Sequence, residues 1–144
     1  MKSKSIDLGY VPMAGYTPKD PLNPEWQTPG HEWYQKGDEL KNVDEKDVVL
    51  QRGTYDLVIT YPLSNPFHKL FDVKAKGMTR RELVNLIVKC YKKIYADEDK
   101  AVGKETENIP GMLNRQTSEG PYGIWGHCLG DLILHTARVE RMTI

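Results

Sequence analysis

The chain has 144 residues, of which 39% are hydrophobic and 28% are charged, and its formal net charge is zero. This length suits one domain with a hydrophobic core, and the balanced charge gives no general attraction to nucleic acid or to an anionic membrane surface. No apolar run approaches the roughly 18 residues that a membrane-spanning helix needs, so we expect neither nucleic acid nor a membrane as a partner.

The N-terminal segment, residues 1–36, is rich in proline and aromatic residues and shows no helical or strand period. Its prolines, at positions 12, 18, 21, 24 and 29, remove hydrogen-bond donors, so we predict an extended arm without central-strand pairing. Exposed aromatic side chains need a surface to cover them, so we predict that this arm binds a partner, a second copy or its own domain through Tyr10, Tyr16, Trp26, Trp33 and Tyr34. The segment lacks the apolar core of a secretory signal, so we expect an intracellular, cytoplasmic location.

Residues 37–144 are predicted to form a single α+β domain. After a charged stretch at 37–47, β-branched and aromatic residues at 48–51 and 54–62 flank Arg52-Gly53 and predict a β-hairpin. A third strand is predicted at 68–75, where Leu70 is out of phase with Phe71 and Val73.

The strongest pattern is a helix at 79–95. Thr79 and Glu82 have the spacing of a capping box, in which each side chain accepts a hydrogen bond from the other residue's backbone. Apolar residues follow on a face wide enough for burial on two sides, and 96–100 is predicted to end the helix. We expect the sheet to cover one row and the N-terminal arm or a partner to cover the second, which consists of Val84, Val88, Tyr91 and Tyr95.

The segment GPYGIWGHCLGD, residues 120–131, has two interpretations. Its glycines allow tight turns, and Ile124, Trp125, Cys128, Leu129 and Leu132 have helical spacing. We therefore favour a short core-packing helix or turn with Trp125 buried against the 83–94 face of the main helix. The alternative is a catalytic site, with His127, Cys128 and Asp131 as candidates. A lone cysteine near an apolar helix is more often a small core residue than a nucleophile, so we favour the structural interpretation.

Residues 132–144 carry several β-branched side chains and are predicted to be a strand, with a helix as the alternative. The expected fold class is therefore α+β: a small, mainly antiparallel sheet with one main covering helix and an extended N-terminal arm.

Neither metal nor cofactor is expected. The histidines and the two cysteines, Cys90 and Cys128, lack metal-ligand spacing, and the cysteines are expected to be reduced thiols. A basic stretch around the helix start makes Lys76, Arg80 and Arg81 candidate anion-binding residues. The alternative, which we favour, is that these residues pair with the acidic stretch at 38–47.

Two segments together resemble a known family. GMTRRELVNLIVKCYKKIYADED (77–99) and GPYGIWGHCLGDLIL (120–134) are similar to small uncharacterised proteins of large DNA viruses and some protists that share a YGIWGH signature. The resemblance covers roughly residues 54–144. It implies this organisation, and a location in a virus-infected cell or a virion, but no reaction. An acidic residue is usual in the family where this chain has Cys128, which argues against a family cysteine nucleophile.

The sequence therefore favours a non-enzymatic protein-interaction or assembly subunit that uses its N-terminal arm and binds a protein partner or itself. The alternative is a small enzyme or phosphate-ligand-binding protein. Its site would combine His127 and Asp131 with the basic start of the 79–95 helix.

Overall fold

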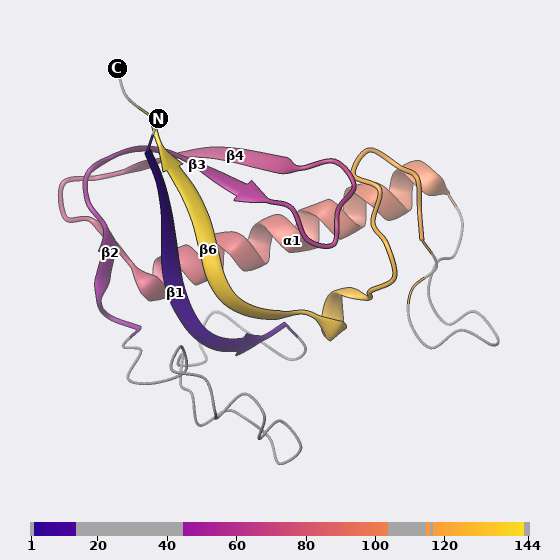
Figure 1. Ribbon diagram of the computed structural model, residues 1–144, viewed down its shortest axis with the longest axis horizontal. Helices are drawn as coiled ribbons and strands as arrows, with labels where there is room; N and C mark the ends of the chain where they lie inside the picture. Colours follow the sequence, from indigo (N-terminus) through magenta and orange to yellow (C-terminus); the bar gives the residue numbers. More distant parts are fainter. Residues whose placement is uncertain (1, 14–44, 104–114, 116, 143–144) are drawn as a thin grey trace, which may run out of the picture.

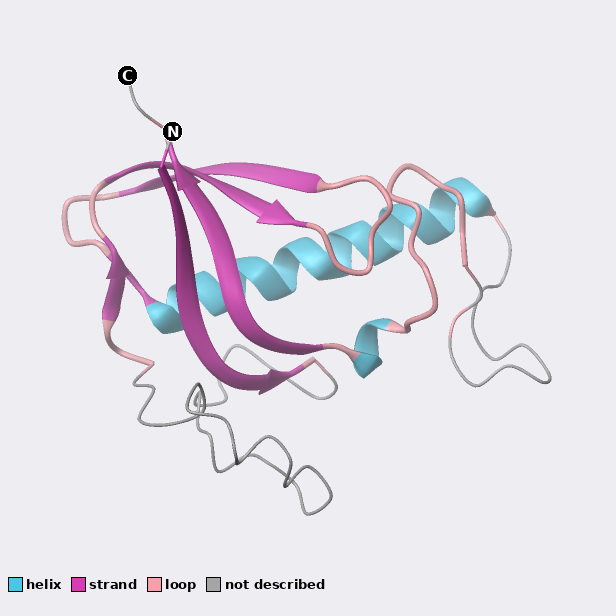
Figure 2. Ribbon diagram, in the orientation of Figure 1, coloured by secondary structure: helices cyan, strands magenta, loops and turns pink. Residues whose placement is uncertain are grey.

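A computed structural model describes residues 2–13, 45–103, 115 and 117–142. In these residues a four-stranded antiparallel sheet has the order β1-β6-β3-β4, and a second sheet pairs β2 with β5. The long helix α1 lies across one face of the larger sheet (Figures 1 and 2), so the predicted α+β class is confirmed. The elements are β1 (Lys2–Pro12), β2 (Val48–Leu50), β3 (Gly53–Ile59), β4 (Phe67–Val73), β5 (Met78–Thr79), α1 (Arg80–Val102), the 3₁₀ turn η4 (Leu129–Asp131) and β6 (Ile133–Arg141).

The hairpin in this fold is β3–β4, in register from Gly53↔Val73 to Ile59↔Phe67. The predicted pairing of 48–51 with 54–62 is wrong, because β2 pairs with β5 instead. Gly77 precedes β5 with a φ of 82°. A β-carbon there would lie 2.6 Å from Val48 Cγ1, so the absence of a side chain allows β5 to approach β2. The alternating pattern had located the strands but could not identify their partners.

Residues 2–12, which we expected to lie extended without central-strand pairing, form the edge strand β1 of the larger sheet, a strand that the sequence pattern did not show. β1 pairs with β6 from Lys2↔Arg141 to Pro12↔Ile133, with a register shift between Asp7 and Val11. At that shift the inward and outward side chains stop alternating regularly, so the sequence shows no strand period. The buried side chains are Ile6, Leu8, Val11 and, just beyond the strand, Met13. The first of the prolines stands at the last position of an edge strand, where a missing donor is tolerated. Residues 14–36, the predicted domain boundary and the side chains of Tyr10, Tyr16, Trp26, Trp33 and Tyr34 lie outside what the structure describes.

Helix α1 begins as predicted and ends later. Thr79 is its N-cap, and both hydrogen bonds of the capping box with Glu82 are present. The predicted end at 96–100 is wrong, because the helix continues to Val102 and stops at Gly103, which has a left-handed φ of 70°. The residues beyond Tyr95, nearly two further turns, include the buried Glu98, whose contacts are described below.

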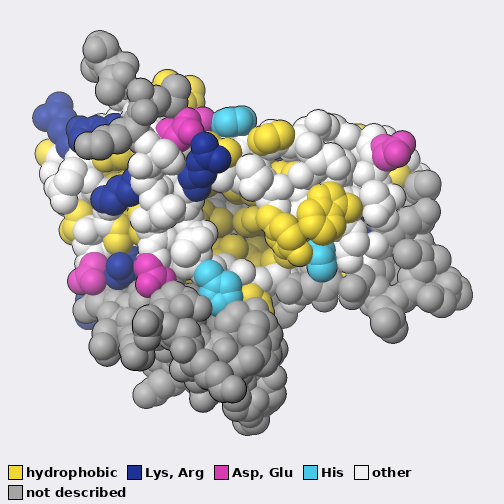
Figure 3. Space-filling view, viewed as in Figure 1, with side chains coloured by type: hydrophobic (Ala, Val, Ile, Leu, Met, Phe, Trp, Pro, Cys, Tyr) yellow, Lys and Arg dark blue, Asp and Glu magenta, His cyan; other side chains and the backbone are white. Residues whose placement is uncertain are grey.

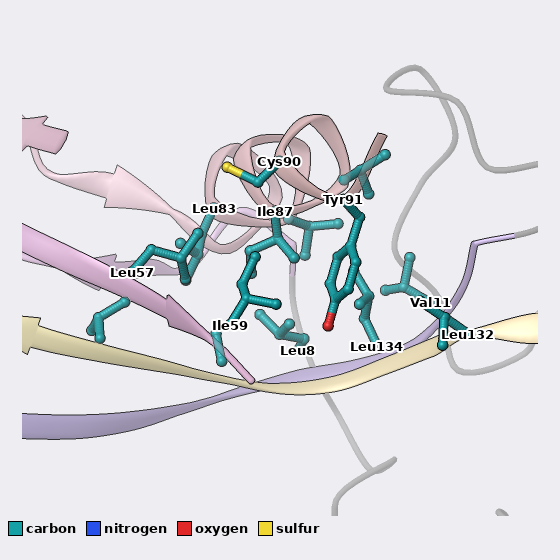
Figure 4. Close-up of a cluster of buried hydrophobic side chains, with 14 of the residues drawn as sticks. Leu8, Val11, Leu57, Ile59, Leu83, Ile87, Cys90, Tyr91, Leu132 and Leu134 are labelled. Carbon is teal, nitrogen blue, oxygen red and sulfur yellow. The ribbon is translucent and has the colours of Figure 1, made fainter. Parts of the chain in front are cut away.

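The core lies between α1 and the sheet (Figure 4). Both apolar rows of the helix are buried, including Val84, Val88, Tyr91 and Tyr95. In Figure 4, Tyr91 lies beside Val11, Leu132 and Leu134. The second row is therefore covered in part by β1 and β6 of the same chain. None of the helices in the described residues has the length and apolar character needed to cross a membrane.

Candidate functional site

The glycine-rich segment 120–131 is a loop attached to the connection between β3 and β4. Leu63 and Ile124 form an antiparallel bridge, the Trp125 N–H donates to the Pro62 carbonyl at 3.1 Å, and the Ser64 N–H donates to the Gly123 carbonyl at 2.9 Å. Ile124 is fully buried. The expected short helix or turn is the 3₁₀ turn η4. The residues before it are not helical, because backbone hydrogen bonds join Gly123 and Trp125 to residues 62–64, and Gly123 has a left-handed φ of 64°.

Glu98 of α1 binds the backbone of this loop. Its side chain is fully buried and accepts a hydrogen bond from the Ser118 hydroxyl at 2.6 Å. The backbone N–H groups of Gly120 and Tyr122 donate to its two oxygens at 2.8 and 2.9 Å, and that of Ile124 donates at 3.4 Å. One carboxylate thus organises the turn that the glycines permit.

The same contacts determine the charge of Glu98. Burial alone would raise the pKa of its carboxyl, but the hydrogen bonds from Ser118 and from the backbone of Tyr122, Gly120 and Ile124 outweigh that effect. Its pKa is therefore below the ordinary value, and the group is an anion at neutral pH. An ionised carboxylate accepts stronger hydrogen bonds than a neutral one, so the charge strengthens the attachment of the loop.

Arg115 extends this network. Its side chain is buried, its Nη2 lies 2.6 Å from Asp99 Oδ1, and the same nitrogen donates to the Ser118 hydroxyl at 3.2 Å. The guanidinium also lies over the ring of Tyr95, 5.2 Å from its centroid. Two consecutive acidic residues of α1 therefore hold the segment around Ser118.

We did not identify Glu98 from the sequence, although a signal was present. Glu98 follows Tyr91 by seven positions and Ile94 by four, so it falls on the buried face of the helix. An acidic residue at such a position needs several hydrogen-bond donors nearby. The acidic run ADEDK concealed it among exposed charges.

Three aromatic rings form a group that we call the aromatic cluster: the exposed Tyr61 and Trp125 and the half-buried His127. The Tyr61 and Trp125 rings meet edge to face with centroids 5.0 Å apart, and each contacts the His127 ring at 5.5 and 5.7 Å. Trp125 is 39% exposed and Tyr61 49% exposed. The prediction that Trp125 is buried against α1 is wrong, because the neighbouring Ile124 is the buried side chain.

Among the candidate catalytic residues, the structure gives the hydrogen bonds of His127. His127 Nε2 lies 2.8 Å from the Tyr61 hydroxyl, and the His127 carbonyl accepts a hydrogen bond from the Tyr95 hydroxyl. Cys128 is half-buried, and neither it nor Cys90 forms a disulfide. Asp131 ends η4, and its side chain is not described. His127 thus contacts two tyrosines, Tyr61 through its ring and Tyr95 through its backbone carbonyl.

The basic helix start is engaged elsewhere. Arg80 Nη1 lies 3.2 Å from Asp47, and its Nε donates to the Asp7 carbonyl. Arg81 Nη1 lies 2.7 Å from Glu45, while Lys76 is exposed. The favoured pairing with the acidic stretch is confirmed for both arginines. Arg80 is also about 22 Å along the helix from Tyr95, which contacts His127, so the two parts of the alternative site are not adjacent.

A cleft opens where β3 leaves β6. β6 pairs with β1 as far as Ile133, but its pairing with β3 ends at Val58↔Arg138. Beyond that pair, β3 and β6 diverge, as Figure 1 shows. A cavity of about 250 Å³ lies at this divergence, with Ile87 and Tyr91 of α1 among its lining residues. Figure 3 shows hydrophobic side chains in a hollow on this face.

The cleft adjoins the aromatic cluster and has a fixed wall. Tyr61 belongs to both, and the Tyr91 hydroxyl donates to the Tyr61 carbonyl at 2.8 Å. Burial raises the pKa of Tyr91 to about 12, with a smaller contribution from Tyr61, so this hydroxyl remains a donor at physiological pH. The arrangement provides apolar surface and two exposed aromatic rings.

No protein-family model matches the chain, and neither a curated protein nor a solved structure is significantly similar to it. In the described residues no group of three or more histidine, cysteine or acidic side chains has an arrangement that could hold a metal ion.

Proposed function

We propose that this protein is a non-enzymatic interaction or assembly subunit, and that the cleft between β3 and β6, with the aromatic cluster at its rim, binds an apolar segment of a protein partner. The single observation that carries the proposal is the exposure of Tyr61 and Trp125 beside a cavity whose lining includes the hydrophobic side chains of Ile59, Ile87 and Leu134. Tyrosine and tryptophan supply much of the binding energy at protein interfaces, because each buries a large rigid surface.

The contacts around the cleft favour binding over catalysis. The hydrogen bond from Tyr91 and the attachment of residues 120–124 to Glu98 fix the rim before any partner arrives. Such preorganisation lowers the entropic cost of association. This proposal includes the predicted role of the arm, residues 1–36, in partner binding, with Tyr10, Tyr16, Trp26, Trp33 and Tyr34 as its contacts. It also includes the virion or infected-cell location that the family resemblance implies.

Selection of a random-peptide phage library on the immobilised full-length chain tests the proposal. We expect enriched peptides with apolar residues, and a synthetic copy of one should bind at least tenfold more weakly to Trp125→Ala and Tyr61→Ala chains. Val48→Ala removes an equally exposed hydrophobic side chain outside the cleft and should leave binding unchanged. Enriched peptides whose affinity is indifferent to both aromatic substitutions would contradict the proposal.

A further inference from the structure

Strand β4 is an edge of the four-stranded sheet and carries its most exposed large hydrophobic side chain. Its neighbour is β3 on one side, and no strand pairs with its other side in the described residues. Figure 1 shows β4 along the margin of the sheet. Leu70 is 60% exposed, more than any other large hydrophobic residue described. An edge of this length offers a row of backbone donors and acceptors to another strand.

The strand is symmetric about Leu70. Phe67–Val73 has Leu70 at its midpoint, and His68 and Asp72 stand two residues to either side of it on the same, outward face. A second copy of β4 that pairs antiparallel about a two-fold axis at Leu70 would therefore place His68 opposite Asp72, and Leu70 opposite Leu70. Only this register pairs all seven residues.

We infer that the chain forms a homodimer through β4, in which two four-stranded sheets join into one continuous sheet of eight strands. The occupant of this edge is a second copy, because a basic and an acidic group are placed symmetrically about an exposed leucine. That arrangement is self-complementary under a two-fold axis.

The side chains of each face suit this pairing. His68 Nδ1 already contacts Asp56 at 2.7 Å, and its second ring nitrogen remains for Asp72 of the second copy. On the helix side, Lys69 would lie opposite Phe71 of the second copy, where its aliphatic stem can cover the ring. Two leucines meeting on the axis remove apolar surface from water in both copies.

An interface made by one pair of strands buries little surface area, so we expect a dissociation constant on the order of 10 µM. This dimer is independent of the proposed partner site, because the residues that line the cleft do not include β4. A failure of one proposal therefore leaves the other standing.

Sedimentation equilibrium of the full-length chain provides the first test. We expect dimers at concentrations above the dissociation constant, and a Leu70→Lys chain should associate at least tenfold more weakly, because two ammonium groups would meet on the axis. Leu70 is exposed, so this variant should keep the wild-type circular dichroism and melting temperature. Val48→Lys is the matched control and should dimerise normally. A wild-type chain that is monomeric at about 500 µM, fifty times the expected constant, overturns the inference.

Cross-linking tests the register. Directly opposite residues have β-carbons about 4.5–5.5 Å apart, so oxidised glutathione, added as the oxidant, should convert the Leu70→Cys chain rapidly to a disulfide-linked dimer and be reduced to two thiols. His68→Cys should not, because its copies lie several residues apart. The wild-type chain controls for Cys90 and Cys128. Cross-linking at position 68 but not at 70, or a dimer that persists unchanged in Leu70→Lys, contradicts the proposed pairing.

Discussion

Glu98 and Gly120 fit each other without room for a side chain: a β-carbon at position 120 would lie 2.6 Å from Glu98 Oε1. The glycine permits the carboxylate to reach the backbone N–H groups of the loop. This contact joins the C-terminal half of α1 to the segment that positions Trp125 and His127.

We expect Gly120→Ala to lower the free energy of unfolding by about 3 kcal/mol, because Glu98 is buried and cannot move aside without losing its donors. Urea unfolding measures the change. Gly126→Ala is the control variant, because no heavy atom lies within 4 Å of the added β-carbon. Its loss of stability should come from the left-handed φ of 67° alone and should be about 1–2 kcal/mol. A Gly120→Ala chain as stable as the wild type would show that the loop is not held in this way.

Glu98→Gln should lower stability at neutral pH by about 2–3 kcal/mol, because it replaces a charged acceptor of several hydrogen bonds with a neutral amide. The folded state lowers the pKa of Glu98 below its ordinary value of 4.5. Its contribution is therefore complete above that pH and is lost as the pH falls through the folded-state pKa. We expect the stability difference between wild type and variant to narrow on acidification below 4.5. Denaturant unfolding of both chains between neutral and acid pH measures this difference in free energy. A difference that does not change with pH would contradict the lowered pKa of Glu98.

Trp125→Ala should lower the free energy of unfolding by about 1–2 kcal/mol, less than a core aromatic would, since the indole is 39% exposed and contacts the rings of Tyr61 and His127. Ile124→Ala, at the neighbouring buried position, should cost about 2–5 kcal/mol. Thermal melts of the two variants test the direction of these side chains. If both variants lose the same amount of stability, Trp125 belongs to the core as the sequence had predicted.

The two thiols should differ in reactivity. Burial raises the pKa of Cys90, against a smaller lowering by Lys69 and Lys89, so its reactive thiolate is scarce. Cys128 is half-buried. We expect a thiol reagent to label Cys128 first and Cys90 only after unfolding, as mapped by mass spectrometry over time. Native Cys90 that reacts as fast as Cys128 would contradict its burial.

Features encoded by neighbouring residues could be predicted from the sequence. The capping box at Thr79 and Glu82 lies within one helical turn, and its geometry follows from two side chains. The strand at β6 follows from its β-branched residues, although its ends, Ile133 and Arg141, differ from the predicted range.

Features that depend on distant residues could not be predicted. β2 was assigned to the wrong partner because its true partner, β5, begins at Met78, beyond the β3–β4 hairpin. The register shift after Asp7 hid the pattern of β1. The donors for Glu98 lie at Ser118 and beyond, so a pattern read within the helix gave no reason to expect a buried carboxylate.

The pairing of β1 with β6 has a kinetic consequence. The first described strand completes the sheet only by hydrogen-bonding to the last, so the contacts that close the core are separated by most of the chain. Folds dominated by such long-range contacts form slowly, because much loop entropy is lost before the contacts stabilise the structure. During synthesis, the apolar side chains of β1 and of α1 cannot be fully buried until residues 133–141 have left the ribosome. Until then the nascent chain exposes surface that a chaperone would recognise.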